Sequence, residues 1–172
     1  RRDADYSVIM VIGVDEEFNI YVLDMFRGQI APFDCGEKIF EYADMYKPKL
    51  VNIEETGHFM LRDYVQKVSK ETGRFLNIMP KKAIKAKYFR IKEMQPYFAS
   101  KAVFMKDSHF ELEQELLAFK EHGTFKKDTL DALRWSMDDM YKPSVSMNKK
   151  GEWVIPGLTV GCDWETGQMI YN

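Results

Sequence analysis

Residues 6–14 read YSVIMVIGV, and this stretch decides the fold class. A nearly continuous apolar run is typical of a strand that is buried on both faces of a sheet. The charged residues 15–17 (DEE) follow as a turn. Residues 18–26 (FNIYVLDMF) then alternate in polarity and are rich in β-branched and aromatic side chains. We therefore predict two adjacent strands joined as a hairpin.

Helices and shorter strands alternate after this hairpin. Apolar residues at helical spacing predict five helices. Two of them cover residues 35–46 and 84–97. One runs from a cap at Thr56 to residue 68, one covers 111–119 with Ser108 as its cap, and the last runs from Lys127 or Asp128 to about residue 141. Short apolar runs predict strands over 49–53, 75–79 and 102–105. This order predicts an α/β fold, with a mixed β-sheet flanked by helices.

The tail from Lys142 onward has a different character, because proline and glycine punctuate it repeatedly. Residues 152–155 and 169–171 have the composition of short strands that could pair with each other. We therefore expect one domain over residues 1–141, and a C-terminal appendage over 142–172 that contains a small hairpin.

Composition limits the classes of protein that the chain can belong to. Its 172 residues suit one domain with a substantial core. The formal net charge of −2 means that any basic surface must be local. Cys35 and Cys162 have no CxxC spacing, so we expect reduced thiols and a cytosolic compartment. No apolar run approaches the roughly 20 residues that a membrane-spanning helix needs, and no GxxxxGK[ST] motif marks a nucleotide site.

Acidic residues occur where strands or helices could aim them at one point. Glu54 ends an apolar strand, Asp5 precedes another, and Asp128 and Asp131 lie three residues apart on one face of a helix. Carboxylates that converge repel one another unless a cation lies between them, and hard cations such as Mg²⁺ prefer oxygen ligands. The pattern therefore suggests metal-assisted phosphodiester chemistry.

Each of these acids also has an ordinary structural explanation. Glu54 could be a solvated carboxylate at the end of a strand, as could its neighbour Glu55. Asp128 suits a helix N-terminus through the helix dipole alone. Asp131 lies among apolar neighbours, where an unpaired carboxylate is costly. We assign no metal-ligand role to the three histidines, His58, His109 and His122, because they have no ligand spacing.

Residues 81–92 (KKAIKAKYFRIK) form the one concentrated basic stretch. On a helix, Ile84, Tyr88 and Ile91 would form an apolar face. Lys81, Lys85 and Lys92 would then point toward water. These charges suit either a solvated helix face or contacts with DNA phosphates. The candidates for DNA contact are Lys81, Lys82, Lys85, Lys87 and Arg90.

Four segments together resemble one known family. They are DYSVIMVIGVDEEFNIYVLDMFRG (5–28), KPKLVNIEETGHFMLRDYV (47–65), KAKYFRIKEMQPYF (85–98) and KKDTLDALRW (126–135). In this order and spacing they resemble the C-terminal nuclease domain of the viral large terminase subunit, the DNA-packaging motor of tailed phages and herpesviruses. The resemblance covers about residues 3–141 and leaves the tail uncovered.

The resemblance implies a ribonuclease H-like fold and a two-metal-ion endonuclease that cuts concatemeric double-stranded DNA. It implies that Glu54 and Asp131 bind Mg²⁺ or Mn²⁺, with Asp128 assisting, and Asp5 looks like an accessory acidic residue of the family. Two ions about 3.5–4 Å apart would activate water and stabilise the leaving oxygen. Lys87 and Arg90 resemble a basic pair that the family keeps in this region.

The resemblance also implies partners: double-stranded DNA, an ATPase domain in the same parent chain, a small terminase subunit and the capsid portal. The setting would be the host cytoplasm, without a membrane.

One departure from the family is clear. The family's first catalytic Asp ends a strand that precedes the DYSV segment, and no room for that strand exists ahead of Arg1. We therefore expect a fragment of a longer protein, with the first strand missing upstream. Two alternatives follow: a catalytically incomplete DNA-binding or motor-coupling domain, and another ribonuclease H-like nuclease such as a junction resolvase.

Overall fold

The fold is taken from a computed structural model of the chain, which describes residues 6–55, 59–120, 127–140, 146–147, 153–155, 158–162 and 169–171. Four residues of the sequence predictions, Asp5, Thr56, His58 and His122, lie outside these ranges.

The predicted hairpin is confirmed. Strand β1 (Ser7–Val14) pairs antiparallel with β2 (Ile20–Gly28), and the short strand β5 (Val103–Phe104) lies parallel to β2 on its other edge. Asp15 organises the turn, because its Oδ1 accepts the backbone N–H groups of Glu17 at 3.0 Å and Asn19 at 2.8 Å. An Asp that accepts backbone donors in this way is a common turn former.

A second sheet contains the two parallel strands β3 (Val51–Glu54) and β4 (Ile78–Lys81). Glu54 lies opposite Lys81 at the carboxyl ends of this pair. The strand expected over 75–79 begins later, at Ile78, because only residues opposite β3 gain ladder hydrogen bonds; Phe75 is 78% exposed.

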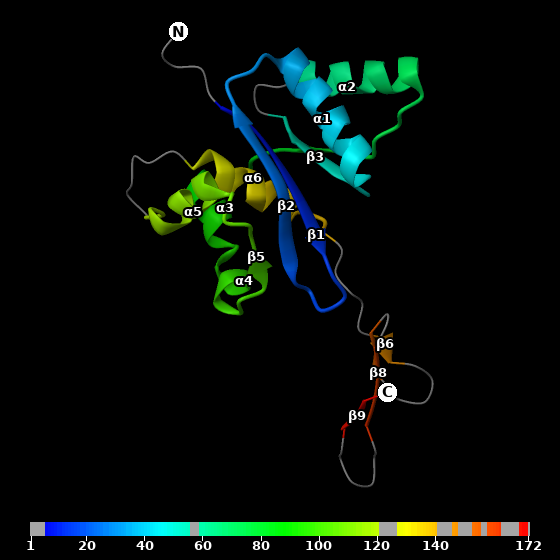
Figure 1. Cartoon of the computed structure of the whole chain (residues 1–172), viewed down its shortest axis with the longest axis vertical. Coiled ribbons are helices and arrows are strands. Elements are labelled where there is room, and N and C mark those ends of the chain that lie inside the picture. The colour runs from blue at the N-terminus through cyan, green and yellow to red at the C-terminus, as the bar shows by residue number, and fades with distance from the viewer. Residues whose placement is uncertain are drawn as a thin grey trace.

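Helices flank both sheets, so the predicted mixed α/β architecture is confirmed. They are α1 (Pro32–Tyr46), α2 (Phe59–Thr72), α3 (Lys87–Lys92), α4 (Gln95–Ala99), α5 (Phe110–Leu117) and α6 (Asp128–Ser136). Figure 1 shows α1 and α2 together beside β3, whereas α3 to α6 gather on the other side of the hairpin.

The apolar core is divided in the same way. One cluster joins β2 to α3, α5 and α6, and its fully buried members include Ile20, Leu112 and Leu130. The other joins α1, α2 and β3, and includes Phe40 and Val65. Side chains of β1 pack against both clusters, Met10 on the first and Ile9 on the second. The hairpin therefore lies between two cores.

The predicted helices differ from the structure in their bounds: α1 begins at Pro32 and not at residue 35, and α2 ends at Thr72 and not at residue 68. The helix expected over 84–97 is broken into α3 and α4, where Pro96 stands in the first turn of α4 and lacks the N–H that a continuous helix requires. Ile84 is 93% exposed and contributes to no apolar face. The N-cap of α5 is His109 and not Ser108, and the Nδ1 of this histidine accepts the Lys106 N–H at 3.3 Å.

Helix α6 ends at Ser136 and not near residue 141. Two features stop it. Asp139 adopts a left-handed backbone with φ 55°, and the Asn52 side chain of β3 donates to the carbonyl of Trp135 in the last turn and to that of Asp138 just after it.

The tail carries a separate antiparallel sheet of β6 (Ser146–Met147), β7 (Trp153–Ile155), β8 (Leu158–Cys162) and β9 (Met169–Tyr171). Strands β7 and β9 correspond to the expected ones, but each pairs with β8 and not with the other. The sequence analysis missed β8, which contains Gly161.

Two further findings concern the Cys35 thiol and the length and polarity of the helices. Cys35 is free and buried, and burial raises the pKa of its thiol. None of the described helices is both long and apolar enough to cross a bilayer.

Candidate functional site

Two carboxylates from distant parts of the chain meet at one guanidinium. Glu54 ends β3, Asp131 lies in the first turn of α6, and Arg90 lies on α3. The Nη2 atom of Arg90 is 2.6 Å from Oδ2 of Asp131 and 3.7 Å from Oε1 of Glu54. The fold therefore brings together the two acids that the sequence analysis singled out.

The contact between Arg90 and Asp131 is forked and buried. Besides the Nη2 contacts, Nε of Arg90 donates to Oδ1 of Asp131 at 3.2 Å. The two side chains are only 10% and 8% exposed. The guanidinium also donates to the Lys85 carbonyl at 2.9 Å and lies 4.8 Å from the centre of the Trp135 ring. Such a pair holds both groups in one geometry, and removing one partner leaves a buried charge without compensation.

Asp128 pairs with a second cation, the Lys87 ammonium. Its Oδ1 accepts the Lys87 ammonium at 2.7 Å, and the same nitrogen lies 3.7 Å from Oδ2 of Asp131. Three carboxylates, Glu54, Asp128 and Asp131, are thus linked through two cations. The cluster keeps an excess of one negative formal charge.

A buried glutamate that the sequence analysis missed positions this end of α6. Glu115 on α5 is 4% exposed, and its Oε2 accepts the backbone N–H groups of Thr129 at 2.9 Å and Leu130 at 3.0 Å. No residue of α6 itself supplies a side-chain cap. Glu115 therefore satisfies free donors of the helix and fixes the turn that carries Asp128 and Asp131. The sequence carries no signal for this contact, because Asp128 at the start of α6 is itself a residue type that caps helices.

The described residues do not form a metal site as they are arranged. Within them no group of three or more His, Cys, Asp or Glu side chains is placed to hold an ion. The guanidinium and the ammonium take the positions between the carboxylates that a cation would need. Mg²⁺ or Mn²⁺ would have to replace Arg90 and Lys87 as partners of these acids.

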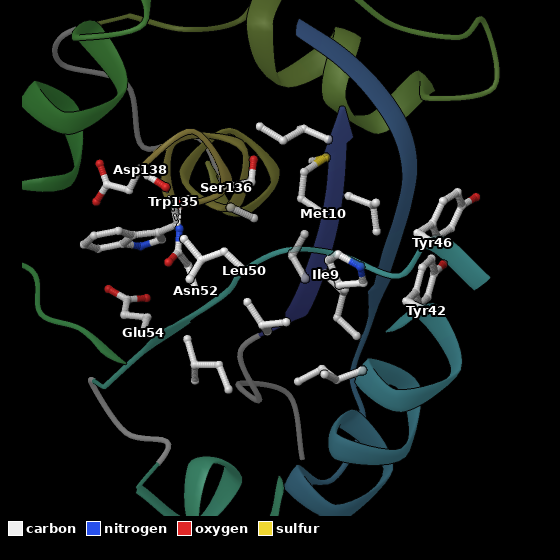
Figure 2. A pocket seen from close by; sticks show the side chains of 18 of the residues that line it. Ile9, Met10, Tyr42, Tyr46, Leu50, Asn52, Glu54, Trp135, Ser136 and Asp138 are labelled. Atoms are coloured by element: carbon white, nitrogen blue, oxygen red, sulfur yellow. Dashed lines mark hydrogen bonds between the residues drawn. The ribbon is translucent and has the colours of Figure 1, made fainter. Parts of the chain in front are cut away.

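A cavity of about 580 Å³ opens beside the cluster, between β1, β3 and α6. Figure 2 shows Asn52, Glu54 and Trp135 together at one end of it, with Ile9 and Met10 of β1 along the other part. The Oδ1 atom of Asn52 and the Nε1 atom of Trp135 are buried, and neither has a hydrogen-bond partner within the described residues. The site therefore keeps one unused acceptor and one unused donor.

The basic stretch is mostly paired with acids. Lys81 contacts Asp139, and its side chain is only 15% exposed, so the expectation that it points to water is wrong. Lys85 is exposed and pairs with Glu93. Hydrogen bonds from Lys85 and then from Arg134 lower the pKa of Glu93. Lys82 is exposed.

Comparisons with known proteins give weak structural similarity alone. No family model matches the sequence, and no curated protein matches it. Among solved structures, RuvC of T. thermophilus in complex with a Holliday junction substrate is similar at 12% sequence identity and a TM-score of 0.44. The similarity covers 76% of this chain and 84% of that one.

Proposed function

We propose that this chain is the nuclease domain of a viral DNA-packaging terminase, and that it cuts double-stranded DNA with the help of divalent metal ions. The proposal starts from the four segments that resemble this family. In the structure these segments supply β1 and β2, β3, α3 and α4, and α6. Three of these segments build the site: β3 carries Glu54, α3 carries Arg90 and α6 carries Asp131.

One observation carries the proposal: Glu54 and Asp131 lie at 3.7 and 2.6 Å from the same nitrogen of Arg90. Carboxylates are costly to bring together and to bury. A site that does so is a candidate for binding a cation, and Mg²⁺ and Mn²⁺ are the cations that suit carboxylate oxygens. When bound, such ions would activate water and stabilise the leaving oxygen of a phosphodiester.

The residues of this chain would have distinct roles. Glu54, Asp128 and Asp131 would hold Mg²⁺ or Mn²⁺, two ions in the complete site. Lys82 is exposed and could contact a DNA phosphate as it stands. Lys81, Lys85, Lys87 and Arg90 would first have to leave their acidic partners. Phosphate contacts of this kind bind DNA without reading its sequence.

A second function is favoured because the carboxylates of the cluster are already paired with basic side chains. Arg90 neutralises Asp131, Lys87 neutralises Asp128, and the described residues complete no metal site. These features suit a domain that binds DNA, or couples DNA to the packaging motor, without cutting it. In either case the proposed partners are double-stranded DNA, the ATPase domain of the same parent chain, the small terminase subunit and the capsid portal.

Nicking of supercoiled plasmid in Mn²⁺ or Mg²⁺ tests the first proposal. We expect the chain, alone or extended upstream by the length of one strand, to convert supercoiled plasmid to open circles. The substitutions Glu54→Gln and Asp131→Asn should each abolish this conversion. The matched control is Glu55→Gln, because Glu55 is adjacent, carries the same charge and pairs with Arg62 at 3.0 Å, away from the cluster.

The other outcomes separate the alternatives. If neither protein cuts and both still retard DNA in a gel, the DNA-binding or motor-coupling function is correct. Faster cutting of four-way junctions than of linear duplex would instead indicate a junction resolvase. If the Glu54→Gln protein nicks plasmid as fast as the unaltered chain, Glu54 has no catalytic role.

A further inference from the structure

Helix α3 has a second face that the carboxylate cluster does not use. Lys87 and Arg90 of this helix contact the acids of α6. At about 3.6 residues per turn, Tyr88, Phe89 and Lys92 lie on the remaining side of the helix. Phe89 is 58% exposed, so this face holds a large aromatic ring in water. What surrounds the ring decides what it can bind.

An open hollow of about 890 Å³ lies beside the Phe89 ring. Ala86 and Pro96 add to its apolar lining, and the side chains of Lys85 and Lys92 line it as well. Its volume falls within the range of about 300–1,000 Å³ that is usual for ligand pockets. A flat ring with lysines beside it suits a ligand that has a flat apolar face and carries negative charge.

The positive charge at this hollow is only partly compensated. Lys85 pairs with Glu93, and Glu93 also contacts Arg134 at 2.7 Å, so this carboxylate is shared between two cations. Lys92 is exposed and pairs with no acid within the described ranges. Its ammonium is therefore available to an anion.

The Tyr88 ring continues the surface toward α5 and α6. It lies edge-on to Phe89, with 5.4 Å between the ring centres, and stacks on Phe119 at 5.3 Å. Nζ of Lys92 and Nζ of Lys127 each lie 5.8 Å from the centre of Tyr88, and Nζ of Lys127 lies 5.4 Å from that of Phe119. Cation–π attraction holds both ammonium groups near the rings. We call these five residues the aromatic–lysine patch.

We propose that the aromatic–lysine patch binds single-stranded DNA, with an unpaired base in the hollow against Phe89 and neighbouring phosphates on Lys92 and Lys127. Proteins that bind single strands combine aromatic side chains, on which bases stack, with cations that follow the backbone. The bases of a duplex are already stacked on their neighbours and do not offer a free face to Phe89. Such binding needs neither a metal ion nor cutting, so it goes beyond the proposed function and does not depend on it.

The positions of the two lysines favour a strand over a small anion. Lys92 lies on α3, and Lys127 is the N-cap residue of α6. They approach the same Tyr88 ring from different elements, so their charges are spread along the patch and not gathered at one point. A strand presents one phosphate per nucleotide and can meet both lysines while a base stacks on Phe89.

Fluorescence anisotropy in EDTA tests the proposal, because EDTA prevents metal-dependent cutting. The probe is a labelled single strand of mixed sequence, about twelve nucleotides long, which is within the usual site size for such proteins. The same strand paired with its complement as a blunt duplex is the second probe. We expect the chain to bind the single strand with an affinity that falls as salt is added.

Phe89→Leu removes the ring and keeps an apolar side chain. It should weaken binding of the single strand by about fivefold or more, because one stacked base is lost. Binding of the duplex should change little. The control is Phe33→Leu on α1, across the hairpin from α3 in Figure 1. Phe33 is also 58% exposed and also contacts one tyrosine ring, that of Tyr64 at 4.7 Å.

Lys92→Gln tests the phosphate contact separately. Loss of one contact should reduce the slope of log affinity against log salt concentration by about 0.7, the value for a single strand. Phe89→Leu should leave this slope unchanged, because stacking releases no counterions. Lys70→Gln on α2 is the matched control, since Lys70 is likewise exposed and has no acidic partner in the described part of the chain.

Phe89→Trp supplies a direct signal from the hollow. The larger ring should keep the affinity for the single strand, and its indole fluorescence should be quenched when a base stacks on it. The unaltered chain gives the background from its own tryptophans. Quenching by the duplex equal to that by the single strand would show that no unpaired base enters the hollow.

Three other results would overturn the proposal. The first is no binding of the single strand even at low salt. The second is an unchanged affinity of Phe89→Leu for the single strand, or an equal loss for both probes. The third is the same loss in Phe33→Leu. Plasmid nicking by a chain that fails these tests would leave the proposed function intact, whereas single-strand binding by a chain that does not nick would support the patch alone.

Discussion

Asn52 on β3 donates both hydrogens of its side-chain amide to the end of α6, at 2.8 Å to the Trp135 carbonyl and at 2.9 Å to the Asp138 carbonyl. These bonds hold α6 against β3. Since α6 carries Asp131 and β3 carries Glu54, they also set the position of one acid relative to the other.

Replacing Asn52 with Ala should destabilise the fold. The substitution removes two hydrogen bonds and leaves the carbonyls of Trp135, in the last turn of α6, and Asp138, just after it, without a side-chain partner, which costs about 1–3 kcal/mol. Urea denaturation gives the free energy of unfolding. Asn77→Ala is the control, because Asn77 makes one exposed bond, to the Lys49 carbonyl at 3.2 Å, and should cost less. Equal losses would show that Asn52 does not hold α6.

The Arg90–Asp131 pair should show strong coupling. Arg90→Met alone leaves the buried Asp131 carboxylate with only the Lys87 ammonium, at 3.7 Å, and should cost about 3–5 kcal/mol. Adding Asp131→Leu should restore much of that stability, because two apolar side chains then replace the pair. A double-mutant cycle from urea denaturation measures the coupling. Lys38→Ala, which breaks the exposed pair with Glu41, serves as the reference and should cost less than about 1 kcal/mol. Additive losses at Arg90 and Asp131 would contradict a close buried pair.

Glu115→Gln should weaken the start of α6. The buried carboxylate accepts two backbone N–H groups of this helix, whereas a neutral amide oxygen is a weaker acceptor and brings an NH₂ group into the same buried space. We expect a loss of about 1–2 kcal/mol in the free energy of unfolding, similar to the loss of a helix cap. Glu113→Gln on the exposed face of α5 should change little. Equal stability of both variants would show that Glu115 does not cap α6.

Buried His109 should make stability fall in mild acid. Burial, and then the charge of Lys106, lowers the pKa of His109 below its ordinary 6.5. The unfolded chain therefore takes up a proton as the pH falls through 6.5, while the folded chain does not. Stability contributed by neutral His109 is complete above pH 6.5 and is lost as the pH falls toward the lower folded pKa.

Urea denaturation at several pH values below and above 6.5 checks this. His109→Gln should flatten the dependence of the free energy of unfolding on pH in that range. If the free energy of unfolding of the His109→Gln protein still depends on pH to the same extent, another titrating group causes the dependence.

The two strands of the hairpin were predictable because their signal is local. The run YSVIMVIGV and the alternating segment after it specify strand structure within a few residues. The bounds of α6 were not predictable, since the residue that occupies its last carbonyls, Asn52, is distant in sequence. The break between α3 and α4 had a local signal in Pro96, which the apolar spacing of residues 84–97 concealed.

The candidate site was also predictable only where its signals are local in the sequence. Glu54 and Asp131 could be named from their places at a strand end and on a helix face. Their cations could not be assigned: Arg90 and Lys87 belong to a basic stretch that suited solvent or phosphate equally well. Which charges pair depends on long-range contacts, and a sequence pattern does not carry these.

The proposed cutting of DNA requires Glu54 and Asp131 to act together on a divalent cation. Titration of Mn²⁺ into the isotopically labelled chain, followed by the loss of amide NMR signals, tests this most directly, because the paramagnetic ion broadens the signals nearest to it. We expect the signals of Glu54, Asp128 and Asp131 to broaden before those of exposed acids such as Asp15 and Glu111. Broadening that begins at those exposed acids, with Glu54 and Asp131 unaffected, would contradict the account.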